Sequence, residues 1–302
     1  MALTPDQEPI PLRCEDGWTL AVFPRPARGS PRGVVCMGHA MMVDHRTLDR
    51  RGEGLAATLA SAGFHTLMLD VRGHGRSTPL PASGGDWRYD DIIRQDLPAL
   101  NALARERYPG LPVAGLGHSL TAHAGLASLG LGCMQVDAFV SIAANTWIRA
   151  FARSRWDWWV KRAASELFRA ASWPLRRFPA RALGGGTDDV SWSYVSQSTD
   201  WARGGRWCSD DGAIDYHAGL AGVGAPVLAV HGAGDIRLSS PSSSRLFHAP
   251  IPAVEHLDVS RQSFGYDADH MSLVTRPEGR PVWEAIAKWL DATLPKPPDG
   301  PA

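Results

Sequence analysis

A regular alternation of short apolar runs with longer amphipathic segments constrains the fold of this chain most strongly. The apolar runs are hydrophobic almost throughout, as is typical of strands buried on both faces of a parallel sheet. The segments between them have the length and apolar spacing of surface helices. Predicted buried strands cover 33–37, 64–70, 111–117, 136–142, 226–232 and 254–260, and predicted helices cover 52–63, 90–108, 120–130 and 280–294. Strand and helix in turn predict an α/β protein with a right-handed, mostly parallel, doubly wound sheet.

Two shorter strands, in 10–14 and 18–23, precede this pattern and bring the predicted sheet to about eight strands. Asp16-Gly17 supplies the turn between them. The alternation stops at Asn145 and resumes after about Leu220, and eight of the twelve tryptophans lie in that interval. We therefore expect a helical cap inserted after the sixth strand. The predicted domains are a first core part (1–144), the cap (145–220), a second core part (221–294) and a disordered tail (295–302).

Composition excludes several classes of protein. The chain has 302 residues, is 44% hydrophobic, and carries 31 basic and 31 acidic residues. That apolar content supports a sizeable core, and a neutral chain lacks the charge that drives nucleic-acid binding, so no nucleic-acid partner is expected. The four cysteines lie far apart, and the N-terminus lacks the pattern of a secretory signal, which together favour the cytoplasm. The uncharged stretch 108–136 contains two prolines and six glycines, so we do not expect it to be a membrane helix.

A serine lies at the predicted turn between the strand 111–117 and the helix 120–130. A sharp strand-to-helix turn holds the hydroxyl of such a serine clear of the sheet, and it needs very small residues two positions to either side. Gly117 satisfies the first position, whereas Thr121 occupies the second, where glycine is usual. The alternative interpretation of Ser119 is an ordinary helix N-cap.

A carboxylate and a histidine follow the last two predicted strands. Asp235 comes just after the strand 226–232, where α/β sheets place their chemistry, although an aspartate in a Gly-Asp turn is a common alternative. His270 lies in the loop between the strand 254–260 and the closing helix. The order Ser119, Asp235, His270 is the nucleophile, acid, histidine order of one hydrolase fold and differs from the orders in two unrelated protease folds.

Four nearby residues receive structural interpretations instead. His231 is predicted to pack against or brace the acid loop, and His256, inside a predicted strand, to be buried. Asp267 and Asp269 are so close to His270 in sequence that we expect them to order its loop.

On these motifs the chain is identified as a member of the α/β-hydrolase superfamily over about residues 10–294. The segment 33–40 resembles the strand-three and oxyanion-loop region, with Gly38-His39-Ala40 in place of the usual H-G-x. The segment 69–77 resembles the D-x-R-G-x-G-x-S sequence of esterase-like and lipase-like members. The Trp-rich cap is similar to that of a bacterial group of predicted hydrolases of undefined substrate. Serine at the elbow argues against haloalkane dehalogenase or epoxide hydrolase chemistry, and no carboxylate occupies the alternative acid position in 143–145.

The resemblance implies a role for each site residue. Ser119 would be the nucleophile, His270 its base, and Asp235 the carboxylate that orients the histidine. The backbone N–H groups of Leu120 and Ala40, with Met41 as the alternative, would form the oxyanion hole. The predicted substrate pocket takes residues from the core loops and from the cap, where large aromatic rings can supply contact area. Its predicted lining is His39, Met41, His118, Trp147, Trp158, Trp159 and Met271.

The leading functional hypothesis is a cofactor-free serine hydrolase acting on a small-molecule carboxylic ester, thioester or lactone. An acyltransferase using the same triad and a non-catalytic binding protein are the alternatives. No metal is expected, because His39, Asp44 and His45 lack further ligands nearby. The chain is expected to be a monomer or a homodimer.

The stretch 149–181 holds nine basic residues and two acidic ones. A basic, aromatic helix can dock on an anionic membrane surface, although a solvated arginine-rich face is the more common arrangement. Membrane contact is therefore the less favoured expectation.

Overall fold

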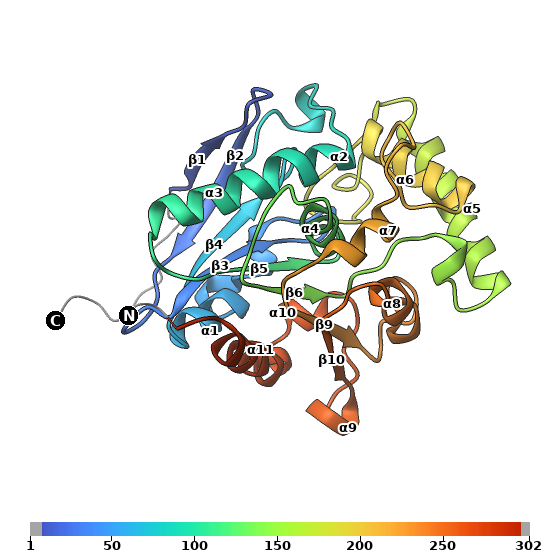
Figure 1. The fold of residues 1–302 in the computed structure, drawn as a ribbon. Helices are drawn as coiled ribbons and strands as arrows, with labels where there is room; N and C mark the ends of the chain where they lie inside the picture. The colour runs from blue at the N-terminus through green and yellow to red at the C-terminus, as the bar shows by residue number, and fades with distance from the viewer. Residues whose placement is uncertain (1–7, 297–302) are drawn as a thin grey trace.

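The computed structural model describes residues 8–296, and within this range eight strands form one sheet in the order β1-β2-β4-β3-β5-β6-β9-β10 (Figure 1). The strands β1 and β2 are antiparallel to each other, β2 is antiparallel to β4, and every other pair is parallel. The strands are β1 Ile10–Arg13, β2 Thr19–Arg25, β3 Gly33–Gly38, β4 Phe64–Asp70, β5 Val113–His118, β6 Ala138–Ile142, β9 Val227–Gly232 and β10 Val254–Val259. The predicted mostly parallel sheet is confirmed.

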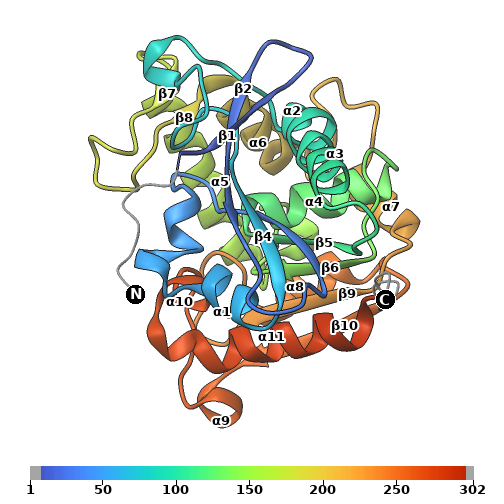
Figure 2. The ribbon, with the colours of Figure 1, turned by 90° about the vertical axis from the view of Figure 1, so that its left-hand side faces the viewer.

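Helices cover both faces of this sheet (Figure 2). On one face α1 (Leu55–Ser61) and α11 (Arg280–Thr293) pack against each other and on the sheet, and on the other lie α3 (Leu97–Arg107), α4 (Leu120–Gly130) and α8 (Pro241–His248). Each face buries its own hydrophobic core, because parallel strands expose apolar side chains in both directions. The remaining short helices are α2 Tyr89–Asp91, α7 Tyr216–Gly219, α9 Arg261–Phe264 and α10 Ser272–Thr275.

The uncharged stretch 108–136 is split between β5 and α4, as the sequence indicates. The helix predicted over 90–108 is present but is interrupted by a π-turn over Ile92–Asp96. Pro98 lies just after this turn, and a proline has no N–H to donate and crowds the carbonyl four residues earlier. The wider turn relieves that conflict.

The prediction that 254–260 is a buried strand is wrong. The strand β10 is the last in the sheet order, so only one edge is paired, and Glu255, His256 and Asp258 are exposed. His256 is therefore not a core residue, although its Nδ1 lies 2.8 Å from the Nε2 of the buried His231.

The cap segment, which we define as residues 145–220, lies between β6 and β9 and contains α5 (Arg155–Ser172), α6 (Trp192–Gly204) and the short α7. It also contains a two-stranded sheet of β7 (Arg177–Phe178) and β8 (Val190–Ser191), which the sequence pattern did not indicate because each strand has only two residues. The two long helices of the cap segment contact each other, and Figure 1 shows α6 nearer the sheet and α5 farther from it.

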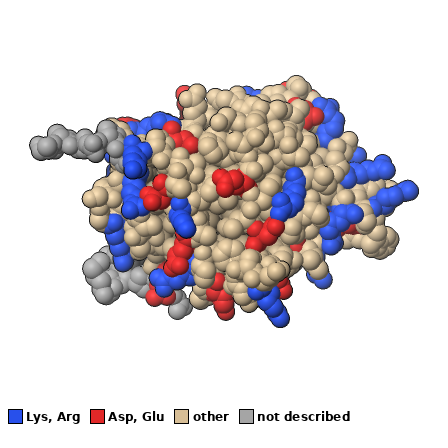
Figure 3. Space-filling model, turned by 60° about the horizontal axis from the view of Figure 1, so that its bottom comes forward, with Lys and Arg blue, Asp and Glu red and all other residues tan. Residues whose placement is uncertain are grey.

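Charge is unevenly distributed over the surface. In Figure 3, basic side chains project from the right-hand end of the molecule, which α5 occupies in Figure 1. Among residues 8–296, no helix is long and apolar enough to cross a bilayer. The tail predicted over 295–302 falls mostly outside the described residues, which end at 296.

Candidate active site

Ser119 occupies the sharp turn that joins β5 to α4. Its backbone has φ 52° and ψ −107°, a left-handed conformation that residues other than glycine rarely adopt and that costs about 1–3 kcal/mol. The turn is held by the N–H of Ser119, which donates to the carbonyl of Ile142, and by the carbonyl of Ser119, which accepts from Ala122 and His123. The surrounding structure thus maintains a strained serine at the end of a central strand, as in a nucleophile elbow.

Close packing around this turn explains why Thr121 and Gly38 stand where the usual motifs have other residues. A Cβ at Gly117 would lie 2.4 Å from the backbone nitrogen of Ala122, so this position requires glycine. Thr121 is accommodated because the neighbouring strand ends in Gly38, whose Cβ would lie 2.6 Å from that of Thr121. The hydroxyl oxygen of Thr121 accepts from the N–H of His118 at 3.1 Å. The same hydroxyl donates to the carbonyl oxygen of His39 at 3.0 Å. Thr121 therefore ties the elbow to the loop after β3.

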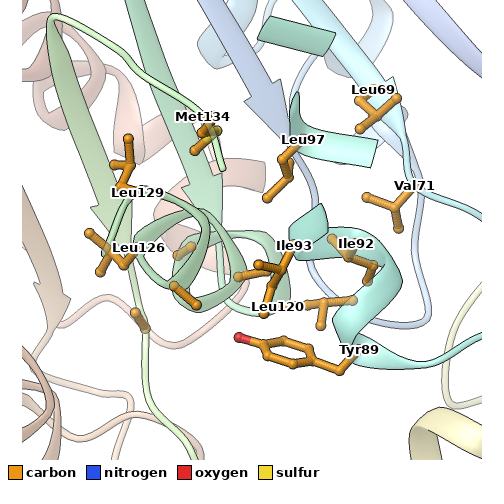
Figure 4. Packing of buried hydrophobic residues seen from close by; sticks show 14 of the residues in the cluster. Leu69, Val71, Tyr89, Ile92, Ile93, Leu97, Leu120, Leu126, Leu129 and Met134 are labelled. Atoms are coloured by element: carbon orange, nitrogen blue, oxygen red, sulfur yellow. The ribbon is translucent and has the colours of Figure 1, made fainter. Parts of the chain in front are cut away.

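The helix after the elbow is anchored in the hydrophobic core. Leu120, its first residue, is fully buried, and Figure 4 shows its side chain beside Tyr89, Ile92 and Ile93. Farther along α4, Leu126 and Leu129 are buried in the same cluster. A rigid helix at this position fixes the strained backbone of Ser119.

Asp235 and His270 form a hydrogen-bonded pair across two loops. The Nδ1 of His270 lies 2.6 Å from the Oδ2 of Asp235, and the other carboxylate oxygen of Asp235 accepts from the N–H groups of Leu238 and Ser239. Burial alone would raise the pKa of Asp235, but the bonds from His270 and from the backbone outweigh it and hold the pKa below its ordinary value. The carboxylate therefore stays charged at neutral pH and fixes Nδ1 of His270 as the donor.

Two glycines allow these loops to approach each other. A Cβ at Gly232 would lie 2.3 Å from the carbonyl oxygen of Ala268, and one at Gly234 would lie 2.8 Å from that of Asp267. The N–H of Gly234 donates to the carbonyl of Ala268 at 2.9 Å. The two glycines of the sequence His-Gly-Ala-Gly-Asp thus allow the acid loop to approach the backbone of the histidine loop, in addition to forming a turn.

His118, next to Ser119, connects the elbow to the histidine loop. Its Nε2 lies 2.9 Å from the carbonyl oxygen of His270, so Nε2 carries the proton and donates. Burial lowers the pKa of His118 to about 3, and the ring is therefore neutral. Ser119, His118 and His270 are thereby joined through one short chain of contacts. Within residues 8–296, the hydroxyl of Ser119 itself makes no direct hydrogen bond to His270.

The candidate oxyanion donors lie where β3 and β5 end. Leu120 is the first residue of α4, so its N–H has no partner inside the helix, and none is found for it or for the N–H of Ala40 or Met41 in the described part of the chain. His39 is completely buried with both ring nitrogens engaged, since Nδ1 contacts the carbonyl of Ala40 and Nε2 accepts from the N–H of Val71. His39 therefore shapes the loop rather than presenting a free nitrogen.

A contact that the sequence did not reveal joins this loop to the cap segment. The carbonyl of Met42 accepts from the N–H groups of Thr187 and Asp188. The buried carboxylate of Asp188 accepts in turn from the N–H of Gly75 at 2.8 Å. Met42 itself has a φ of 67°, so this junction also stores backbone strain. The sequence does not indicate this contact, because Met42 and Gly75 lie more than a hundred positions before Asp188 and no local pattern connects them.

The remaining predicted pocket residues occupy different surroundings. Met41 and Met271 are half-buried. Trp147 is half-buried and donates from Nε1 to the carbonyl of Leu238 in the acid loop. Trp158 is half-buried beneath the guanidinium groups of Arg149 and Arg162, whereas Trp159 is about half exposed.

A cluster of possible metal ligands is already committed to internal contacts. The side chains of Asp44, His45 and Asp70 approach within 4.8 Å of one another. However, Asp44 is paired with Arg46, and Asp70 accepts from the backbone and ring of His45 and from the N–H of Arg76. Because the oxygens of both carboxylates already accept these hydrogen bonds, the cluster fits a structural network better than a cation site.

Comparisons with known proteins identify the family of the chain and its fold. The family model described as "Serine aminopeptidase, S33" matches residues 29–198, which is more than half of the chain. No curated protein matches the sequence.

Solved structures of esterases and lipases resemble the chain over nearly its whole length. A soluble variant of monoglyceride lipase from Saccharomyces cerevisiae, in complex with a substrate analogue, has a TM-score of 0.70 at 16% identity and covers 96% of this chain and 97% of its own. An esterase from Pyrococcus furiosus has a TM-score of 0.63 at 16% identity, with 95% and 91% covered. A thermophilic esterase from Thermogutta terrifontis has a TM-score of 0.59 at 16% identity, with 95% and 98% covered. The fold is therefore shared, and with the family match it shows that this chain belongs to the serine aminopeptidase S33 family of the α/β-hydrolase superfamily.

Proposed function

We propose that this protein is a cofactor-free serine hydrolase that cleaves a carboxylic ester through an acyl-enzyme. The observation that carries the proposal is the 2.6 Å contact between His270 and Asp235 on loops that also contact the strained Ser119 turn through His118. A serine hydroxyl is a weak nucleophile at neutral pH, so it needs a neighbouring base, and the base needs a carboxylate to hold its tautomer.

In the proposed acylation step, Ser119 Oγ attacks the carbonyl carbon while its proton passes to Nε2 of His270. Asp235, charged and already bonded to Nδ1, stabilises the imidazolium that forms. The tetrahedral intermediate then expels the alcohol, which takes the proton from Nε2. Water attacks the resulting acyl-enzyme by the same route in reverse, and this releases the acid and restores Ser119.

The negative oxygen of each tetrahedral intermediate would be met by the N–H groups of Leu120 and Ala40, with Met41 as the alternative donor. This assignment is supported by the position of Leu120 at the start of α4 and by the unpaired state of these groups among residues 8–296. Removing one such donor in a serine hydrolase costs about 10²- to 10³-fold in turnover.

We further propose that the cap segment and the core loops together bind the acyl or alcohol part of the substrate. Trp147, Met41 and Met271 would contribute from the loops around the triad, and Trp158 and Trp159 from α5. The contact of Trp147 with the acid loop supports its place in this group. Esterases and a monoglyceride lipase among the similar structures are consistent with an acyl ester substrate, whereas the family description names an aminopeptidase.

The test is hydrolysis of p-nitrophenyl esters from C2 to C12, measured with the native protein, Ser119→Ala, and Ser61→Ala as a matched serine variant on α1. We expect Ser119→Ala to lose at least about 10³-fold in kcat/KM, with Ser61→Ala unchanged. An alanine p-nitroanilide tests the amide reaction, and added alcohols test acyl transfer. Ester turnover equal in Ser119→Ala and native protein would contradict the proposal, and turnover that requires the added alcohol would favour the acyltransferase.

A further inference from the structure

The helix α5 is amphipathic in the opposite sense to an ordinary surface helix. Its buried residues are polar: Lys161, Ser165 and Ser172. Lys161 is paired at 3.1 Å with Asp157, and the backbone carbonyl of Ser165 accepts from the hydroxyl of Thr199 on α6. The polar side of α5 therefore faces α6.

The opposite side of α5 is apolar and in contact with solvent. Trp156, Val160 and Leu167 follow the spacing of one helix face, and Trp156 is 77% and Leu167 71% exposed. Trp173, just past the end of the helix, is 66% exposed. A surface helix of a protein that works only in water buries its apolar stripe, so a face of this kind indicates an interaction surface.

Basic residues are concentrated in and beside the helix that carries this face, which we call the outer face of α5. Residues 149–181 hold nine basic and two acidic residues, although the whole chain is neutral. Four of the nine are neutralised, since Arg153 and Lys161 pair with Asp157, Arg169 with Asp200, and Arg177 with Asp189. The guanidinium groups of the other five have no carboxylate within 4.0 Å in the described part of the chain: Arg149, Arg155, Arg162, Arg176 and Arg181. Figure 3 shows basic side chains projecting at this end.

We propose that the outer face of α5 docks on an anionic lipid bilayer. Tryptophan rings prefer the boundary between head groups and acyl chains, and the leucine and valine side chains would enter the apolar layer. The unpaired arginines would meet lipid phosphates and keep their charged ends in the head-group region while their stems cover apolar surface. A protein partner would need to be acidic to meet the same charges, but an apolar face with arginines beside it matches the layering of a membrane surface. The docking rests on the outer face of α5 and not on the triad.

The test is co-sedimentation with vesicles of phosphatidylglycerol, compared with vesicles of phosphatidylcholine, at low and high salt. We expect binding to the anionic vesicles only, weakened by salt. Trp156→Ser with Leu167→Ser should lower that binding by at least about tenfold. Arg155→Glu should lower it by about tenfold to thirtyfold. The matched controls are Leu246→Ser on α8, where leucine is 50% exposed, and Arg280→Glu on α11, and both should bind as the native protein does.

Circular dichroism and the midpoint of urea unfolding establish that each variant is folded, whether or not the protein proves to be an esterase. Equal binding of native protein and the Trp156→Ser, Leu167→Ser variant would overturn the proposal, as would no binding of the folded native protein. Sedimentation velocity tests whether a second copy of the chain covers the outer face of α5 instead of a membrane. A dimer that these same substitutions dissociate would mean that a second copy covers the outer face of α5, and this would also overturn the proposal.

Discussion

A Cβ built on Gly38 would lie 2.6 Å from the Cβ of Thr121, so the end of β3 and the start of α4 meet at the limit of packing. The usual motifs place a glycine at the threonine position and allow a larger residue on the strand. Here the small and the large residue have exchanged places across the contact. The exchange keeps the elbow close to the loop that holds Ala40.

We predict that Gly38→Ala destabilises the protein by about 1–3 kcal/mol, because the new methyl group meets a β-branched side chain that cannot move away. In the Thr121→Gly background the same substitution should cost less, since the space is then free. Urea unfolding of the two single variants and the double variant measures this coupling. Gly224→Ala, where a Cβ meets nothing within 4 Å, is the control. Equal costs of Gly38→Ala in both backgrounds would show that the contact is not the cause.

His118→Ala is predicted to lower kcat/KM by about tenfold while the protein remains folded. The substitution removes the hydrogen bond to the carbonyl of His270, which we regard as positioning that histidine, and leaving a buried acceptor without its donor costs about 1–3 kcal/mol. His118→Gln places an amide N–H near the same atom and should restore part of the activity. A Gln variant no better than Ala would indicate that His118 only fills space.

Much of the fold could be predicted because strand and helix leave different apolar periods in the sequence. Phe64–Asp70 and Leu120–Gly130 form the strand and the helix predicted at those positions. The strand β10 could be predicted at its position, but its exposure could not, because a place at the edge of a sheet depends on which strands lie beside it. At the site, Ser119, Asp235 and His270 could be selected because each follows a strand. The presence of a threonine at position 121 could not be explained, because it depends on the space left by Gly38 on another strand. Asp188 carries no local signal.

Asp235→Asn is predicted to reduce kcat by about 10⁴-fold, since the amide would bind the wrong tautomer of His270 and would not stabilise the imidazolium. The protein should remain folded because an amide oxygen can still accept from the N–H groups of Leu238 and Ser239. Steady-state ester hydrolysis measures the effect, and Asp267→Asn in the neighbouring loop is the comparison. A larger loss in Asp267→Asn would mean that the acid has been misassigned.

Asp188→Ala is predicted to loosen the junction between the cap segment and the core. The substitution leaves the N–H of Gly75 without its acceptor and should cost about 1–3 kcal/mol. Limited trypsin digestion should then cut faster after the exposed Arg181, with Glu284→Gln on α11 as the control. Unchanged cleavage after Arg181 would show that other contacts hold this junction.

Stability is predicted to fall as the pH drops below about 6.5, because burial strongly lowers the pKa of five histidines. The values are about 4 for His74, about 3 for His118, about 3 for His123, about 2 for His231 and about 4 for His248. Below pH 6.5 the unfolded chain binds protons that the folded protein does not, so each group contributes stability above that pH and loses up to about 1.4 kcal/mol per pH unit below it.

This pH dependence can be assigned through His248, which contacts Ser141 and Ser244. His248→Asn removes one of the five groups, so its free energy of unfolding should fall less steeply than that of the native protein between pH 6.5 and 5. Urea unfolding at each pH measures the slope. Identical slopes would exclude His248 as a contributor.

The proposed mechanism depends most directly on Ser119 being a nucleophile activated by His270. The decisive measurement is intact-mass spectrometry after exposure to a fluorophosphonate, with native protein, Ser119→Ala and His270→Ala compared at neutral pH. We expect one adduct per native chain, located on Ser119, no adduct in Ser119→Ala, and strongly slowed labelling in His270→Ala. A folded native protein whose Ser119 remains unlabelled, or labelling that is independent of His270, would contradict the proposed mechanism.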